Sequence, residues 1–442
     1  MSNWFHRNPL KATSKITFDL GVVAESLPAR SICHDLASNR MNLLKLLVDP
    51  AVTTESVLGL TQQYISLLMG FVEAPSNQPS NDSSNEPPSE GPVASNKLRN
   101  MVMFKWSNSA EPKNASPIME PDALFEVCSM LYNVALWLTK HAAKLSAKDE
   151  VSTDEAKEVH TSLRHAAGLI QLIRDKYVSK LNSSPKPGDD LCADVMEAYI
   201  HQSVAEAQEV TLARAIELKH DPSLIAGLAK ETSNMYQKAA LSLKLLDAKV
   251  VGKWLKYLEF KKHCYETCAY VYFAEQQLKI EKAGAGLAII AEAEKAHKLA
   301  IETAKMYGRT EGVGLSAKMA EHCFFRRLGI MIENTRRKLE RENCMIFHQR
   351  VPPSVPVFDL KAQFGVVEPQ APEMDLSVDQ RWKEAYKGFN EKKVSEMILQ
   401  KEQRAKDHKT KSDRTAPVEH VHEKPIFSTD KDPKNESGCV LS

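Results

Sequence analysis

Glycine is scarce in this sequence, at 17 of 442 residues, and no run of about 18 apolar residues occurs that could span a bilayer. The longest apolar stretch, residues 123–138, includes Glu126 and Asn133, so we expect a buried helix there. The formal net charge of +1 provides no overall field that would attract nucleic acid or an anionic membrane. From this charge we expect no nucleic-acid partner. Long stretches rich in Ala, Leu, Glu and Lys predict a mainly all-α protein.

A disulfide framework is also missing, although the chain has eight cysteines. Seven of them are scattered through predicted helices, which is the pattern of a protein in the reducing cytosol. The first residues, MSNWFHRNPLK, contain no apolar signal region and do not begin Met-Gly. We therefore expect neither secretion nor myristoylation.

Sequence motifs for catalysis are absent as well. Residues 283–288, AGAGLA, lack the third glycine of a phosphate-binding loop, and neither Gly-x-Ser-x-Gly nor His-Glu-x-x-His occurs. Cys264 and Cys268 would share a helix face, as zinc ligands do, but no second ligand pair of comparable spacing accompanies them. Small core cysteines are the favoured interpretation. We predict a protein that is not an enzyme and that has no metal or noncovalent cofactor.

Apolar residues at helical spacing recur over most of the chain. A capping box formed by Ser152 and Glu155 predicts the start of one helix, and Asp221, followed by proline, predicts the start of another. Residues 250–280 and 286–307 are expected to form an antiparallel helical pair of tetratricopeptide type.

Four stretches depart from the helical pattern. Residues 1–28 include KITFDLGVV, which predicts a short β segment. In residues 74–96, Pro, Ser, Asn and Gly supply 16 of 23 positions, so we predict a disordered insertion. Prolines cluster in residues 341–369, which we expect to be extended along the helical body. Residues 381–442 are charged and poor in apolar side chains, as in a flexible tail.

Several stretches together resemble the BRO domain family, the helical modules of ALIX and its relatives. They are NPLKAT near the start, YNVALWLTKHA (132–142), EAKEVHTSLRHAAGLI (155–170), EAQEVTLARAIELKHDPSLIAGLA (206–229) and RENCMIFHQRVP (341–352). The resemblance covers about residues 1–370. It implies an elongated, boomerang-shaped BRO domain over 1–380, with a tetratricopeptide-like helical core, a short N-terminal β segment and an extended C-terminal segment packing along the body.

The resemblance also implies a partner. BRO domains bind the C-terminal amphipathic helix of the polymer-forming ESCRT-III subunit through an apolar patch on their concave surface. In this sequence the resemblance places the patch at Leu224 and Leu228, with Thr211 where ALIX has a bulky aromatic residue. The two leucines are four residues apart and would project from one helix face. Without the resemblance, the alternative is that both leucines pack into the core.

The sequence ends Cys439-Val440-Leu441-Ser442, which fits the prenylation pattern, and the final serine favours a farnesyl group. We expect a prenyltransferase to attach that covalent lipid to Cys439. One lipid chain gives only marginal membrane binding. The basic part of the tail, 401–414, has six positive and three negative side chains and would add little. We therefore hypothesise that ESCRT-III provides the second attachment.

Two functional classes are favoured over a third, a thiol- or metal-dependent enzyme that uses the Cys264–Cys268 region. The first is a monomeric, prenylated adaptor, cytoplasmic and peripheral on membranes, that binds ESCRT-III in membrane remodelling or repair; by resemblance, endosomes and the nuclear envelope are candidate membranes. The second is a cytosolic helical scaffold of tetratricopeptide type that serves an unrelated partner and leaves Cys439 unmodified.

Overall fold

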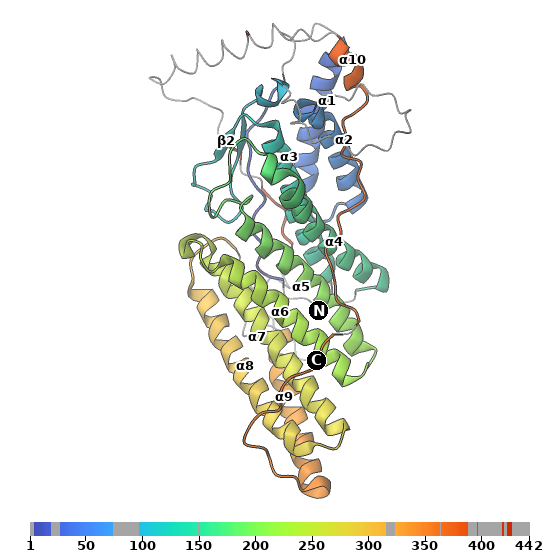
Figure 1. Cartoon of the computed structure of the whole chain (residues 1–442), viewed down its shortest axis with the longest axis vertical. Coiled ribbons are helices and arrows are strands. Elements are labelled where there is room, and N and C mark those ends of the chain that lie inside the picture. The colour runs from blue at the N-terminus through green and yellow to red at the C-terminus, as the bar shows by residue number, and fades with distance from the viewer. Residues whose placement is uncertain are drawn as a thin grey trace, which may run out of the picture.

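The computed structural model describes residues 4–18, 27–73, 97–148, 151–314, 323–362, 364–387, 396, 418–419 and 422–426. The protein is mainly helical, as predicted, and its described elements form an elongated body (Figure 1). Helices α1 to α3 and a small β-hairpin lie toward one end of the long axis, and α8 and α9 lie toward the other (Figure 1). The predicted insertion at 74–96 lies outside the described residues.

The helices of the described chain are α1 (Leu27–Leu47), α2 (Thr54–Val72), α3 (Ala123–Ser146), α4 (Thr153–Leu172), α5 (Ala193–Glu217), α6 (Pro222–Leu243), α7 (Ala248–Lys279), α8 (Ala283–Arg309), α9 (Cys323–Glu342) and α10 (Trp382–Lys387). Short 3-10 or π turns occupy Lys97–Asn100, Ile173–Tyr177, Val178–Lys180 and Asn343–Phe347. Strands β1 (Phe104–Trp106) and β2 (Ile118–Glu120) pair antiparallel, with Lys105 opposite Met119.

The helix starts follow the capping residues of the sequence. Ser152 accepts a hydrogen bond from the Glu155 N–H at 3.2 Å, and Glu155 accepts one from the Ser152 N–H, so the predicted capping box is confirmed. The Asp221 carboxylate caps α6 through the Ser223 N–H at 2.9 Å, with proline at the first helical position. From α3 to α8, each helix packs against the next one in the chain. The predicted pair of residues 250–280 and 286–307 corresponds to α7 and α8.

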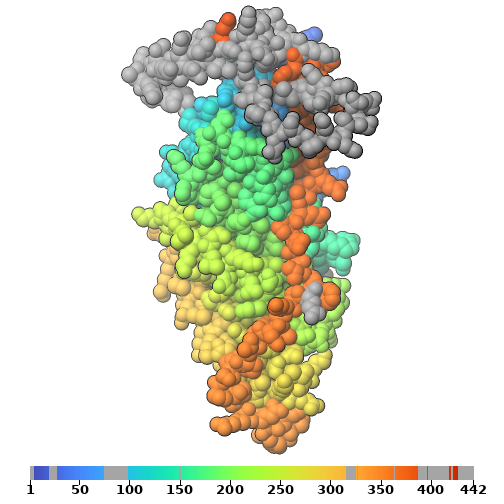
Figure 2. Space-filling view, in the orientation of Figure 1, coloured from blue at the N-terminus to red at the C-terminus, as the bar shows by residue number. Residues whose placement is uncertain are grey.

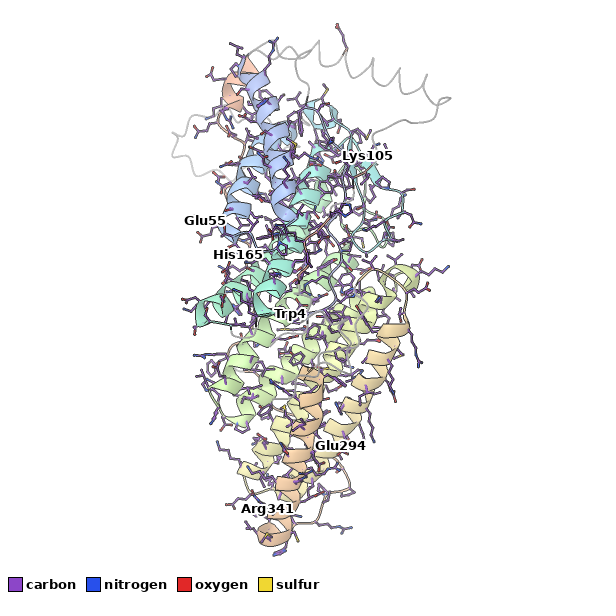
Figure 3. All side chains as sticks on the ribbon, turned by 180° about the vertical axis from the view of Figure 1, so that it is seen from behind. Trp4, Glu55, Lys105, His165, Glu294 and Arg341 are labelled. Atoms are coloured by element: carbon purple, nitrogen blue, oxygen red, sulfur yellow. The ribbon has the colours of Figure 1, made fainter. Side chains whose placement is uncertain are left out.

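The N-terminal segment, residues 4–18, runs extended through the interior instead of over the surface. Within these residues it forms no regular strand, and Thr13 makes an isolated bridge to Trp106; residues 19–23 of the predicted β segment lie outside the described residues. Trp4 is 1% exposed and lies near the middle of the long axis (Figure 3). Lys11 pairs with Asp190 at 2.8 Å while both side chains are fully buried. The segment also contacts α3 through Asn133 and α5 through Glu206, so buried polar contacts join both helices to the hairpin region.

A strap, which we define as residues 349–362 and 364–381, leaves the far end of the body and returns along its surface. Figure 2 shows it as a narrow orange band crossing the yellow and green helices. The Phe358 ring packs against Phe273 of α7, with centroids 4.7 Å apart. On α4, a Cβ atom at Gly168 would lie 2.1 Å from the Ala371 backbone nitrogen, so glycine is required there. The predicted extended segment along the helical body is present.

Two parts of the predicted flexible tail are packed on the body. Trp382 of α10 is 1% exposed and donates its indole N–H to the Leu67 carbonyl at 2.8 Å. Residues 418–419 and 422–426 lie against the N-terminal segment and α3. At these two places the tail is anchored to the body, by the buried Trp382 at α10 and by hydrogen bonds and ion pairs of Glu419, Glu423 and Lys424.

Candidate partner-binding face

The partner-binding face predicted from the sequence lies where α5 ends and α6 begins. Thr211 is on α5, and Leu224 and Leu228 are one turn apart on α6. Leu224 is partly buried against the main hydrophobic core, so part of its side chain faces solvent. Leu228 is only 2% exposed. Of the two leucines, only Leu224 is accessible to a partner in this conformation.

The strap covers Leu228. Gly365 has φ +77°, a conformation that glycine adopts without strain. A Cβ atom at Gly365 would lie 3.4 Å from Thr211 Cγ2 and 3.6 Å from Leu228 Cδ2, which puts the strap backbone in contact with both side chains. The strap is equally close to Gly227, where a Cβ atom would lie 3.0–3.1 Å from backbone atoms of residues 361 and 362. The patch therefore has a closed part under the strap and an open part at Leu224.

Gln208 fixes the strap over this face. Its Nε2 donates to the Gly365 carbonyl at 2.8 Å, and its Oε1 accepts from the Val367 N–H at 2.8 Å. The residue is fully buried, so both hydrogen bonds are shielded from water. Gln208 was not among the residues predicted from the sequence; its one local signal is a polar residue on the buried side of α5.

Apolar side chains remain exposed next to the covered patch. Phe364 is 75% exposed and Val366 is 44% exposed on the strap, on either side of Gly365. Leu218, just after α5, is 52% exposed. The strap therefore presents exposed apolar side chains beside the covered patch, to which the small Thr211 contributes little.

A charged layer lies buried beneath α5. Glu206 accepts two hydrogen bonds from Arg7, at 2.6 and 2.8 Å, and Glu209 pairs with Lys261 at 2.8 Å. Trp4 donates its indole N–H to Glu209 at 2.9 Å. Because each carboxylate has a cationic partner, the layer holds α5 in place and offers no free charge to a ligand.

The cysteines considered as zinc ligands are buried in the core. Cys264 is 1% exposed and Cys268 is 6% exposed, and burial raises the pKa of the Cys268 thiol to about 12. Burial also raises the pKa of the Cys264 thiol. Both are protonated core residues. Within the described ranges, no group of three His, Cys, Asp or Glu residues is placed to hold a metal ion.

The predicted lipid-attachment sequence occupies residues 439–442. Cys439, Val440, Leu441 and Ser442 lie outside the described residues, so the predicted farnesyl site stays a prediction. None of the described helices is long and apolar enough to cross a membrane.

Comparison with known proteins identifies the family. A family model described as the BRO1-like domain matches residues 92–407, and the chain belongs to this family, as the sequence predicted. Among curated relatives, the chain is 42% identical over 369 residues to the BRO1 domain-containing protein BROX of Homo sapiens, covering 84% of this chain and 86% of the relative. It is 38% identical to the Danio rerio BROX and 34% identical to the Caenorhabditis elegans BROX homolog, over the whole of each chain.

Solved structures share the fold at low sequence identity. A structure described as the basis for endosomal targeting by the Bro1 domain matches with a TM-score of 0.61 and 18% identity, covering 90% of this chain and all of the other. A structure of an ALIX BRO1 CHMP4C complex matches with a TM-score of 0.60 and 17% identity, covering 84% and 96%. These similarities establish the architecture of the chain.

Proposed function

We propose that this protein is a non-enzymatic adaptor that binds the C-terminal helix of an ESCRT-III subunit and links it to membranes through a farnesyl group on Cys439. The observation that carries the partner is the fold, which is shared with an ALIX BRO1 domain solved in complex with CHMP4C. Leu224 supports the location, because it is partly exposed on α6, one turn before Leu228.

The two leucines have different roles in this proposal. Leu224 contacts the partner helix directly, and seating a leucine side chain against an apolar partner contributes about 1.5–3 kcal/mol. Leu228 supports the face from beneath the strap. The exposed Phe364 ring provides apolar area that the small Thr211 does not. The binding surface therefore combines α6 with the strap.

The lipid and the partner act together at the membrane. A single lipid chain binds a bilayer marginally and reversibly. Once a helix contact of moderate affinity has formed, the lipid of the same molecule is held near the membrane. Its insertion is then an intramolecular event with a high effective concentration. The proposed adaptor therefore stays on membranes that carry ESCRT-III and leaves those that do not, which fits a peripheral location at sites of remodelling or repair.

Binding of the full chain to a peptide of an ESCRT-III C-terminal helix tests the partner and the face together. Leu224→Asp places a charge on the apolar surface and should weaken binding at least about tenfold. Leu245→Asp is the matched control, because Leu245 is 93% exposed beyond the other end of α6. Equal binding by both variants would show that the face is not used.

The alternative is a helical scaffold for an unrelated partner with an unmodified Cys439. Intact mass of the protein purified from a eukaryotic host separates the two, because farnesylation and trimming of residues 440–442 change the mass. A mass equal to the full unmodified sequence, together with no binding to the helix peptide, would favour the scaffold.

A further inference from the structure

Part of the tail is docked on the body at its α1–α3 end. We call residues 418–419 and 422–426 the clasp, and the body surface that they contact the clasp site. The clasp site combines three elements that are distant in sequence: the N-terminal segment, the turn after α1, and α3.

Glu423 makes the central contact of the clasp. One carboxylate oxygen accepts the Leu10 N–H at 2.7 Å, and the other pairs with the Lys140 ammonium on α3. The Lys140 side chain is only 6% exposed, and burial lowers its pKa while the Glu423 charge opposes that shift. A buried ammonium requires a compensating carboxylate. The clasp site is therefore built for an acidic side chain at this position.

The residues that flank Glu423 extend the contact in both directions. Lys424 donates its N–H to the Val48 carbonyl at 3.0 Å and pairs with Asp49 through its side chain. The Ile426 side chain packs against the main hydrophobic core. At the other end, Glu419 forms a β-bridge with Thr13, with its N–H 3.0 Å from the Thr13 carbonyl. Backbone pairing, a buried charge and an apolar anchor together define a peptide site.

From these contacts we propose that the clasp site is a second peptide-binding site. Its ligand is an extended segment with a glutamate opposite Lys140 and an aliphatic residue three positions later. The chain's own clasp occupies the site as a releasable contact. Ile426 stands three positions after Glu423 in this chain. The clasp thereby sets where the tail is attached to the body.

For the membrane, this inference rests on the proposed lipid at Cys439. With the clasp docked, the 13 residues from Ile426 to Cys439 span at most about 45 Å. With the clasp released, the attachment point moves back to α10, and the 52 residues from Lys387 to Cys439 span at most about 180 Å. A docked clasp keeps the lipid close to the α1–α3 end of the body, and a released one lets it reach far beyond it.

Hydrogen exchange of the full, unprenylated chain tests the clasp without involving ESCRT-III or the lipid. Glu423→Gln keeps the size of the side chain but leaves Lys140 without its charge partner. We expect exchange in residues 10–15 and 418–426 to accelerate at least about tenfold. Glu419→Gln is the matched control on the same segment, since its 3.4 Å pair with Lys15 is exposed on both sides, and it should change exchange little.

A synthetic peptide of residues 416–428 tests the clasp site as a binding site. It should bind the Glu423→Gln chain at least about tenfold more tightly than wild type, because the chain's own clasp competes less. Adding Lys140→Met should abolish that binding. Rapid exchange of residues 418–426 in wild type, or equal peptide binding to wild type and Glu423→Gln, would overturn the clasp and leave the proposed adaptor function untouched.

Discussion

The buried side chain of Gln208 holds the backbone of Val367 at 2.8 Å and so fixes the strap across α5. The same amide donates to the Gly365 carbonyl. It therefore provides the backbone hydrogen-bond partners that an extended segment usually finds in a neighbouring strand. Leu228 is covered because the strap is fixed at this point. The accessible part of the candidate face thus depends on a residue that need not touch a partner.

Gln208→Leu should loosen the strap. The substitution keeps the volume but leaves a strap carbonyl and N–H without partners in a buried place, which costs about 1–3 kcal/mol each. We expect the free energy of unfolding to fall by about 2–5 kcal/mol and hydrogen exchange in residues 364–371 to increase. Gln62→Leu is the control, because Gln62 also accepts a strap N–H, from Asp375 at 3.2 Å, but at an exposed place. Equal losses of stability in the two variants would contradict the role of the buried amide.

Substitutions of Leu228 and Leu224 should lower the free energy of unfolding by different amounts, because the two side chains differ in exposure. Leu228→Ala removes a side chain that is 2% exposed and should lower the free energy of unfolding by about 2–5 kcal/mol in urea denaturation. Leu224→Ala removes a partly exposed side chain and should cost less than about 1.5 kcal/mol. If both substitutions cost the same, the strap does not shield Leu228 in solution.

His6 should make stability depend on pH. Burial, followed by the positive charges of Arg7 and Lys253, lowers the pKa of His6 from 6.5 to about 3. Between these values the unfolded chain binds a proton that the folded chain does not. The stabilisation is therefore complete above about pH 6.5 and is lost as the pH falls toward 3, by at most about 1.4 kcal/mol per pH unit.

His6→Gln removes this titration and keeps a group able to hydrogen-bond with the Tyr307 hydroxyl, which lies 3.2 Å from His6 Nδ1. Urea denaturation between about pH 4 and 7 should show a shallower dependence on pH for His6→Gln than for wild type. His34→Gln serves as the control, since the His34 side chain is 83% exposed, and it should keep the wild-type slope. If stability depended on pH with the same slope in all three proteins, His6 would be ruled out as a source of the pH dependence.

Local patterns were enough to predict the helical fold and much of its detail. The capping box at Ser152 and the capped start at Asp221 depend on residues within three positions of each other, so the sequence displays them directly. The prolines after residue 341 predicted an extended segment for the same reason. Family resemblance then placed the candidate face on α5 and α6.

The covering of the face and the clasp could not be predicted in this way, because both depend on contacts between distant residues. Gln208 meets the strap 157 residues later in the chain, and Lys140 meets Glu423 283 residues later. The mean composition of the tail is polar, which concealed Glu423 and Ile426 as anchoring residues. Trp382 was a stronger signal, since a tryptophan in a charged tail is seldom left in water.

The proposed pairing of lipid and partner helix predicts a coupled loss of membrane binding. On vesicles that display an ESCRT-III C-terminal helix, the farnesylated full chain should bind at least about a hundredfold more tightly than on bare vesicles, because each attachment raises the local concentration for the other. Cys439→Ser and Leu224→Asp should each remove most of that gain, and the double variant, which lacks both attachments, should bind less tightly than either single variant.

Vesicle flotation with the four proteins measures this coupling, and Leu245→Asp controls for the added charge, since that leucine is exposed away from the candidate face. Full binding of Cys439→Ser would mean that the helix contact suffices and that the lipid is not an attachment. Full binding of Leu224→Asp would place the helix contact elsewhere on the body.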